Sequence, residues 1–204
     1  MSIRYYRPQA LDTIARMCVC ENSESYTCTE SKQAVPIEKI IENQYGLTIE
    51  YLYLTNDGRE LGRMICADGY TTYFNKDDNE YAIMAVKSGT ILIDASLLEQ
   101  NANEGRLRFT LAHELAHWLI HKKLYENTCY STFLDEIDNN ENAIEWQANY
   151  LATSILMPAG KIKSSFHALR PVCNDYSDLI SKMAKIFEVS KQAMELRLKS
   201  MSLI

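Results

Sequence analysis

The sequence predicts an α+β fold in which a small sheet packs on a long helix and the C-terminal part of the chain is helical. Short alternating or apolar segments, separated by turn signals, occupy residues 47–94. Two segments with apolar residues at helical spacing follow, at 103–123 and 141–155. Because the strands come first and the helices afterwards, the pattern disfavours a doubly wound sheet and favours an α+β domain.

Length and composition are those of a globular protein. The 204 residues suffice for one well-packed domain or for one domain plus a small appendage. We expect residues 1–34 to form an N-terminal helix and a polar linker, and residues 35–204 to form the main domain, with a helical C-terminal segment at 159–204. The apolar fraction of 47% and the charged fraction of 24% exclude a disordered or fibrous chain.

Charge and hydropathy limit the partners and the compartment. The formal net charge of −6 disfavours non-specific binding to nucleic acid. The sequence contains no run of about 18 apolar residues, and its start lacks the apolar centre of a signal peptide. We therefore expect a cytoplasmic protein that does not associate with membranes. The oligomeric state is not predicted.

The first half of the chain contains two predicted helices and five predicted strands. Pro8 is suited to a helix start, and the apolar face of Ala10–Val19 predicts the first helix. A second helix begins at Pro36 and ends near Tyr45, before Gly46. The strand candidates are Leu47–Leu54, Leu61–Ala67, Tyr70–Phe74, Ile83–Lys87 and Thr90–Asp94.

The most informative motif is the pentapeptide HExxH at residues 113–117, inside the predicted helix at 103–123. His113 and His117 are one helical turn apart, so both imidazoles can reach one metal ion. Glu114 lies on the neighbouring flank, where it can reach a water next to that metal. The spacing supplies two zinc ligands and a general base. The alternative is a buried helix with hydrogen-bonded histidines, which would not require a Glu beside the first of them.

A third protein ligand is expected, because catalytic zinc usually has three. His121 is about 12 Å from His113 along the helix axis, too far for one ion, and we interpret it as a helix-end residue with a partly exposed ring. The helix at 141–155 offers Glu145 as the third ligand. Asn149 lies one turn later and can hydrogen-bond a ligand side chain. Glu141, one turn earlier, is the fallback ligand.

The two motifs together resemble a known family. HELAHWLIH, which starts at His113, and EWQANYLATSILMP at 145–158 are similar to the ImmA/IrrE family of zinc metallopeptidases. The resemblance extends from about Val35 to the C-terminus, and its sharp motifs lie within 107–158. It implies a zincin-like metallopeptidase domain. It also implies these site residues: His113, His117 and Glu145 as zinc ligands, and Glu114 as the catalytic acid. The family prefers Gly where this chain has Ala116, a good helix former.

These observations predict an intracellular zinc-dependent endopeptidase. We expect its substrate to be an extended protein segment beside an edge strand of the sheet near Thr90–Asp94, since that strand precedes the HExxH helix in sequence. The resemblance suggests a transcriptional repressor or similar regulator as the substrate. The alternative is a non-proteolytic zinc-containing protein that regulates a transcription factor. Three tyrosines could donate to an oxyanion and are not ranked: Tyr125, Tyr130 and Tyr150.

Two other features have simpler interpretations. Cys18, Cys20 and Cys28 lack a C-x-x-C pair and a nearby His, so we expect free thiols and no second metal. The last two helices, with Asp175 or Ser177 and then Ser190 as caps, have some helix-turn-helix character. Their basic residues are interleaved with acidic ones, which favours packing over DNA binding. The connection Leu124–Asn140 is expected to line the cleft or to move over it.

Overall fold

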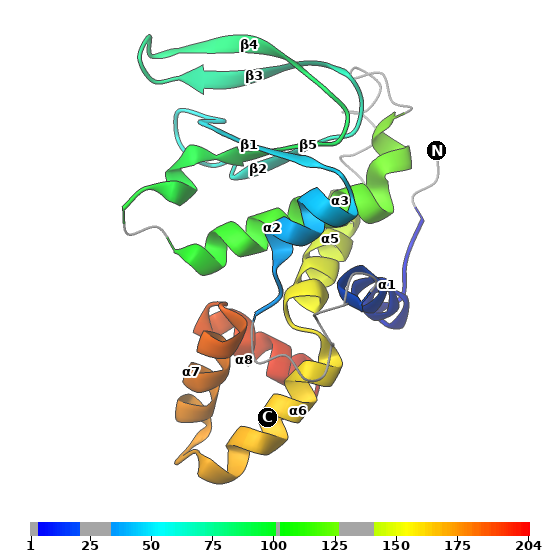
Figure 1. Ribbon diagram of the computed structural model, residues 1–204, viewed down its shortest axis with the longest axis vertical. Helices are drawn as coiled ribbons and strands as arrows, with labels where there is room; N and C mark the ends of the chain where they lie inside the picture. The colour runs from blue at the N-terminus through cyan, green and yellow to red at the C-terminus, as the bar shows by residue number, and fades with distance from the viewer. Residues whose placement is uncertain (1–3, 21–33, 101–102, 127–140) are drawn as a thin grey trace.

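The structure is a computed structural model that describes residues 4–20, 34–100, 103–126 and 141–204 (Figure 1). The helices are α1 (Pro8–Cys20), α2 (Ile37–Lys39), the π-helix η1 (Ile40–Gln44), the 3₁₀-helix η2 (Ala95–Leu98), α3 (Glu104–Glu126), α5 (Glu141–Leu156), α6 (Ala159–Leu169), the 3₁₀-helix η3 (Arg170–Val172), α7 (Tyr176–Phe187) and α8 (Lys191–Ser200). The strands are β1 (Thr48–Leu52), β2 (Gly62–Ile65), β3 (Gly69–Asn75), β4 (Glu80–Val86) and β5 (Thr90–Asp94). The predicted polar linker, Cys28, Tyr130 and residues 127–140 of the predicted connection lie outside the described residues.

Strand β5 is the centre of the three-stranded sheet, whose order is β1-β5-β2. It pairs in parallel with β1 and antiparallel with β2, and all five of its residues are buried. The prediction of an open edge at Thr90–Asp94 is therefore wrong. The run Ile91-Leu92-Ile93 is typical of a strand that is covered on both faces. The edge beside it is β2, which also packs against α3.

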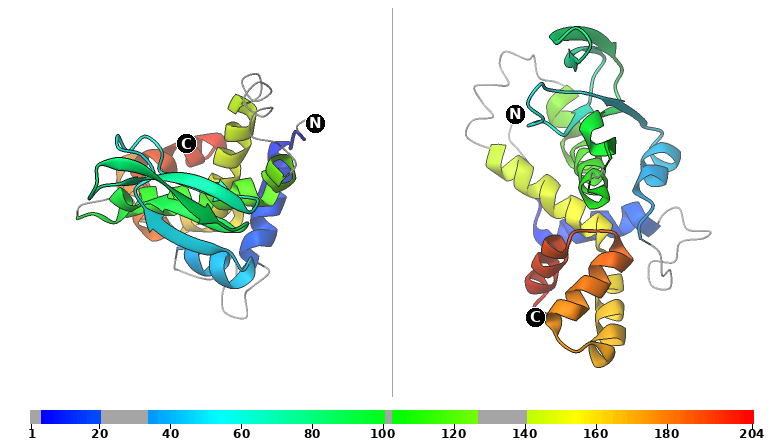
Figure 2. Two further views of the ribbon diagram at one scale, coloured as in Figure 1. Left: turned by 90° about the horizontal axis from the view of Figure 1, so that it is seen from above. Right: turned by 90° about the vertical axis from the view of Figure 1, so that its left-hand side faces the viewer.

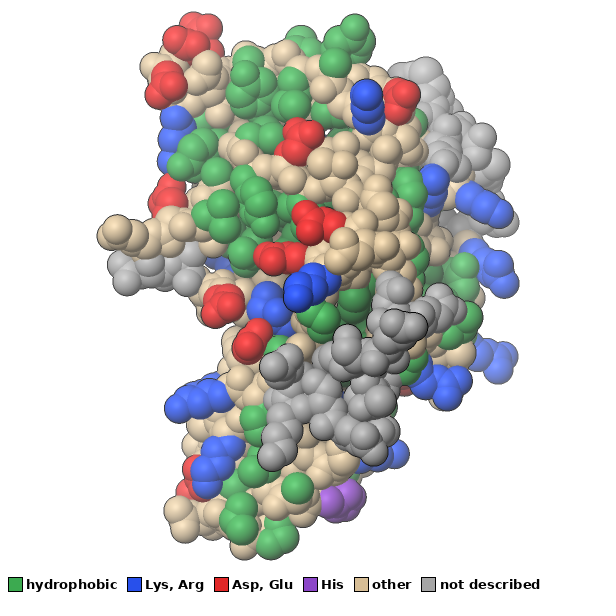
Figure 3. Space-filling view, in the orientation of Figure 1, with side chains coloured by type: hydrophobic (Ala, Val, Ile, Leu, Met, Phe, Trp, Pro, Cys, Tyr) green, Lys and Arg blue, Asp and Glu red, His purple; other side chains and the backbone are tan. Residues whose placement is uncertain are grey.

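The β3–β4 hairpin forms a separate layer above the sheet (Figure 1). A small apolar cluster joins the two layers, and its buried members are Leu54, Ile65, Val86 and Leu92. Tyr70, Tyr81 and Ile83 are exposed on the hairpin. Hydrophobic side chains are accordingly visible on the upper part of the molecule in Figure 3.

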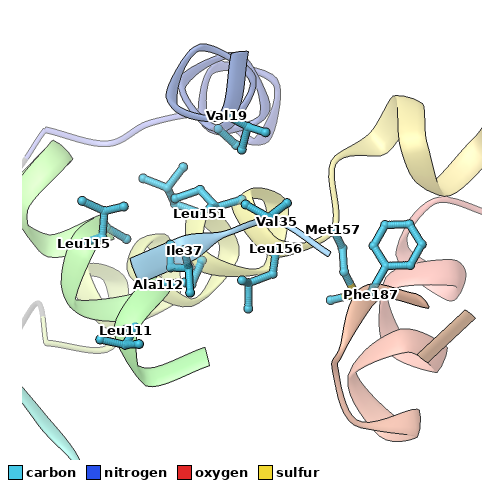
Figure 4. Close-up of a cluster of buried hydrophobic side chains, with 14 of the residues drawn as sticks. Val19, Val35, Ile37, Leu111, Ala112, Leu115, Leu151, Leu156, Met157 and Phe187 are labelled. Carbon is cyan, nitrogen blue, oxygen red and sulfur yellow. The ribbon is translucent and has the colours of Figure 1, made fainter. Parts of the chain in front are cut away.

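The main core lies on the other side of the sheet, where α3 packs against the sheet and against α5. Leu111 and Leu115 of α3 meet Leu151 and Leu156 of α5, and all four are fully buried (Figure 4). Removing each such side chain from water stabilises the fold by about 1.5–3 kcal/mol. A small sheet packed on the HExxH helix, followed by helices, confirms the predicted α+β class.

Helix α1 belongs to the same core and ties α5 to the C-terminal part of the chain. The backbone N–H of Tyr6, just before α1, donates to Gln147 Oε1 on α5 at 2.8 Å. The carboxylate of Asp12 accepts from three side chains: Ser154 (2.8 Å), Tyr150 (3.2 Å) and Arg197 (3.3 Å). Figure 2 (right) shows α1 crossing α5, with α8 below. Two segments that are far apart in sequence therefore fix the position of α5.

The C-terminal helices begin at the predicted caps. Asp178 N–H donates to the side chain of Asp175 at 2.7 Å, and Ala193 N–H donates to Ser190 Oγ at 3.1 Å. These hydrogen bonds satisfy backbone donors at the starts of α7 and α8. Both helices contribute fully buried residues to the main core, among them Phe187 and Leu198. None of the described helices is long and apolar enough to cross a membrane.

The cysteines of the described residues differ in state. Cys18, Cys66 and Cys173 carry buried thiols. Cys20 is disulfide-bonded, so the expectation of free thiols is wrong at this position. The proposed absence of a second metal at Cys18, Cys20 and Cys28 stays a prediction.

Candidate metal centre

The side chains of His113, His117 and Glu145 converge at the contact between α3 and α5. The Nε2 atoms of His113 and His117 lie 3.0 Å apart. Glu145 Oε2 is 3.2 Å from His113 Nε2, and Glu145 Oε1 is 3.3 Å from His117 Nε2. The α-helical repeat places the two imidazoles one above the other, and α5 brings the carboxylate to them. The donors therefore form a triangle with one corner supplied by another helix.

The size and the chemistry of this triangle fit zinc. Zn–N and Zn–O bonds of about 2.0–2.2 Å in tetrahedral geometry separate neighbouring ligand atoms by about 3.3 Å. The two Nε2 atoms are 3.0 Å apart, each lies 3.2–3.3 Å from a different oxygen of Glu145, and one donor atom from each of the three residues lies within 4.8 Å of the other two. Two imidazoles and one carboxylate, with a fourth position left open, are a frequent donor set of catalytic zinc. The side chain of Glu141, the fallback ligand, lies outside the described part of the chain.

The charges around the triangle favour a bound cation. Hydrogen bonds from His113 and His117 hold the pKa of Glu145 far below its usual range, so this carboxylate is ionised. Burial pulls the pKa of His113 down, but Glu145 and Glu114 outweigh that effect and the pKa is raised. The two carboxylates thus create a negative potential at the imidazoles. A divalent cation there would be stabilised by the same field.

Asn149 lies where it can orient the first histidine. Its Oδ1 accepts a hydrogen bond from His113 Nδ1 at 3.1 Å. Because an amide oxygen only accepts, this contact places the proton of His113 on Nδ1 and leaves Nε2 open toward the triangle. Asn149 is one helical turn after Glu145, so α5 presents a ligand and a supporting residue from one stripe.

The structure corrects the interpretation of His121. Helix α3 continues to Glu126, so His121 is not at the helix end, and its ring is only 3% exposed. Its Nδ1 lies 3.2 Å from Nδ1 of His117. Burial lowers the pKa of His121 to about 4, which keeps the ring neutral. His121 Nδ1 can then accept a hydrogen bond from His117 Nδ1–H, just as Asn149 Oδ1 accepts one from His113. The sequence signal for this role was the spacing of four residues between the two histidines.

Glu114 is enclosed between α3 and the sheet, with 6% of its surface exposed. Burial raises its pKa, which brings the carboxylate closer to the neutral range where a general base is effective. Gly62 of the edge strand β2 faces it. A Cβ at Gly62 would lie 2.7 Å from both Glu114 Oε1 and Thr110 Cγ2. The sequence alone does not identify Gly62, because the need for a glycine arises only when β2 meets α3.

Replacing Gly62 by Ala is therefore expected to destabilise the fold by about 1–3 kcal/mol and to displace Glu114. Urea unfolding would measure the first effect and peptide cleavage the second. Gly69→Ala is the matched control, since this glycine also begins a strand and a Cβ there would have no neighbour within 4 Å. Equal effects of the two substitutions would contradict the close approach of β2 to Glu114.

The structure describes two of the three candidate oxyanion donors, Tyr125 and Tyr150. The hydroxyl of Tyr150 donates to Asp12 on α1, so it is engaged in the contact between α1 and α5. The ring of Tyr125 is centred 6.0 Å from that of His117. Tyr130 lies outside the described residues. The ring of Tyr125 therefore lies beside a proposed ligand, whereas the hydroxyl of Tyr150 is bonded to α1.

Comparison with known families places this centre in context. Residues 91–199, more than half of the chain, match the model of the Peptidase_M78 family, described as an IrrE N-terminal-like domain. The chain belongs to this family. A search of curated proteins found no match. The Peptidase_M78 match starts in β5 and includes α3 and α5, so the whole triangle lies within it. The predicted ImmA/IrrE membership is confirmed, and it indicates a metallopeptidase-like function.

Proposed function

We propose that this protein is a zinc-dependent endopeptidase with a zincin-like fold, which cleaves an extended segment of another protein. One observation carries the proposal: the triangle of His113, His117 and Glu145 has zinc-sized separations, and the buried Glu114 stands on the same helical turn. Membership of the Peptidase_M78 family supports it. The three donors hold zinc, Asn149 supports His113, and Glu114 is the general base.

In this mechanism Glu114 moves the proton. Zinc, when bound, acidifies water and polarises the scissile carbonyl. Glu114 accepts a proton from the attacking water as the new C–O bond forms, and delivers it to the amine nitrogen as the C–N bond breaks. Its enclosure by Gly62 and Thr110 restricts the carboxylate to a narrow range of positions. A fixed base close to the attacking water lowers the entropic part of the barrier.

The substrate is best accommodated beside β2. This strand is the sheet edge that touches α3, and Gly62 brings it against Glu114. An extended segment could pair with the β2 backbone and pass the catalytic side chains. The family resemblance supports a transcriptional repressor or similar regulator as that substrate, which would place the reaction in the cytoplasm. We further propose that residues 35–204 form the catalytic domain, and that the N-terminal segment 1–34 adds α1 to its core.

New protein termini would test the proposed activity. The zinc-loaded protein would be incubated with a cytoplasmic protein extract, and new N-termini would be mapped by mass spectrometry. We expect new termini that disappear after chelation and return after zinc is restored. Complete absence of zinc-dependent termini would refute the endopeptidase. An intact partner that stays bound to the zinc form would instead favour the non-proteolytic regulator.

His121 offers a separate test of the metal centre. His121→Leu is expected to weaken zinc binding about 10–100-fold, the usual effect of losing a partner that orients a ligand. His121→Asn retains an acceptor at a position equivalent to Nδ1 and should preserve most of the affinity. Competition with a zinc-binding indicator would measure both. If the Leu and Asn variants bind zinc equally well, His121 does not orient His117.

A further inference from the structure

A groove of about 590 Å³ lies between α3, α5 and α8, beside the metal centre. These helices are neighbours in the right-hand view of Figure 2. Asn149, which accepts from His113, forms part of the groove wall, so the groove adjoins the metal centre on the Nδ1 side of His113. Phe109 lies at the same junction, with its ring centred 6.3 Å from that of His113. The volume is within the usual range of ligand-binding pockets.

The walls of the groove are largely apolar, although they face solvent. Trp146 on α5 is 48% exposed and Leu196 on α8 is 61% exposed. Leu156 and Met157 are buried residues that also line the groove. Exposed apolar side chains that converge in a depression indicate a binding site more strongly than the same residues scattered over the surface.

The described charged side chains that line the groove are all basic. Among the described residues that line it, none is Asp or Glu, whereas Arg106 and Arg197 are both present. Arg197 is buried and bonded to Asp12, but Arg106 is exposed. This arrangement contrasts with the net charge of −6 of the whole chain. An acidic group in the ligand would find a complementary charge at Arg106, and a basic group would be repelled.

The residues of α3 also fix how far each part of the groove lies from the metal centre. Arg106, Phe109 and His113 follow one another at three and four residues, so they form one stripe along the helix. Phe109 is about 6 Å and Arg106 about 10 Å from His113 along the axis. An extended peptide advances about 3.3 Å per residue. These distances correspond to about two and about three residues of substrate.

We propose that this groove receives the protein substrate on one side of the scissile bond. It selects a large apolar side chain about two residues from that bond and an acidic side chain about one residue further. The inference rests on the proposed peptidase function, because it takes the metal centre as the cleavage point. It assigns specificity to α8 and to the first turns of α3, which do not contribute ligands to the metal.

Peptide binding tests the groove without any chemistry. The chain has two tryptophans, so Trp118→Phe in a Glu114→Gln background leaves Trp146 as the only indole reporter. The probe peptides are acetyl-Leu-Asp-amide, acetyl-Asp-Leu-amide and the corresponding Ala-Asp and Leu-Lys peptides. We expect the Leu/Asp peptides to shift Trp146 fluorescence with at least about tenfold higher affinity than the others. Equal affinities would overturn the proposal.

Substitutions on the walls provide the matched comparison. Leu196→Glu should lower the affinity of the Leu/Asp peptides about tenfold or more, and Arg106→Glu should reverse the preference for Asp over Lys. Val172→Glu is the control, because Val172 is 68% exposed on η3 and does not line the groove. All three sites are exposed, and thermal unfolding would verify the fold. An unchanged affinity of the Leu196→Glu variant would contradict the assignment.

Cleavage profiling separates this inference from the proposed function. The zinc-loaded protein, without the Trp118 and Glu114 substitutions, would be incubated with a peptide library made from a digested proteome. Cleaved peptides should be enriched in an apolar residue about two positions, and in Asp or Glu about three positions, from the new terminus on one side. If peptides bind at Trp146 as expected but none is cleaved, the peptide selectivity of the groove is supported and the proposed peptidase activity is refuted. If cleavage occurs without this enrichment, the peptidase activity is supported and the assignment of substrate selectivity to the groove is refuted.

Discussion

Glu114→Gln is expected to reduce peptide cleavage by about 10²–10⁴-fold while zinc remains bound. The amide has nearly the shape of the carboxylate, but it cannot accept the proton of the attacking water. The three proposed ligands, His113, His117 and Glu145, keep their contacts with one another. The loss should therefore appear in kcat with little change in KM, as for an interaction that matters chiefly in the transition state.

Two measurements are needed together for this variant: turnover of a cleaved peptide and zinc content by elemental mass spectrometry. Glu104→Gln is the matched control, since it removes the same charge from the first turn of the same helix at an exposed position. We expect this control to retain both activity and metal. Undiminished turnover of the Glu114→Gln protein would remove Glu114 from the mechanism.

Glu145→Ala is expected to remove zinc from the protein, and with it the activity. Two imidazoles from adjacent turns of α3 would remain, without the carboxylate that closes the triangle at 3.2–3.3 Å. The expected loss of affinity exceeds the roughly 10–100-fold caused by loss of an outer partner such as His121. The positive charge of the ion would also lose the ionised group nearest to it.

Zinc content after dialysis against a weak chelator would measure this effect. Glu195→Ala on α8 is the matched control, because Glu195 forms an exposed ion pair with Lys199 away from the triangle. Circular dichroism of the apo forms separates metal loss from unfolding. Full zinc occupancy of a folded Glu145→Ala protein would show that another group supplies the third ligand.

Local sequence patterns predicted the helices well, because helix signals are short-range. The apolar spacing of α1, the caps Asp175 and Ser190, and the paired positions of Glu145 and Asn149 on α5 are all readable within one or two turns. The two histidines of the HExxH motif meet for the same reason. The sequence also predicts that the helix at 141–155 joins them, and Glu145 of α5 lies at both imidazoles.

The features that the sequence did not predict depend on contacts between distant segments. The sequence predicts an edge strand near Thr90–Asp94, but β5 pairs with both β1 and β2, and no local pattern encodes that strand order. The sequence predicts His121 at the helix end with a partly exposed ring, but α3 continues to Glu126 and His121 is buried. The close contact at Gly62 exists only once β2 has packed on α3, and the groove at Leu196 exists only once α3, α5 and α8 have packed together.

The carboxylate of Asp12 couples the start of the described chain to the metal centre. It holds α5 through Ser154 and Tyr150, and α8 through Arg197. The helix that carries Glu145 is thus also the docking platform of α1. If docking of α1 favours the arrangement of α5 that binds zinc, zinc must favour docking of α1 by the same factor. Zinc binding would then stabilise the docked position of the N-terminal helix, and detachment of that helix would lower the affinity for zinc.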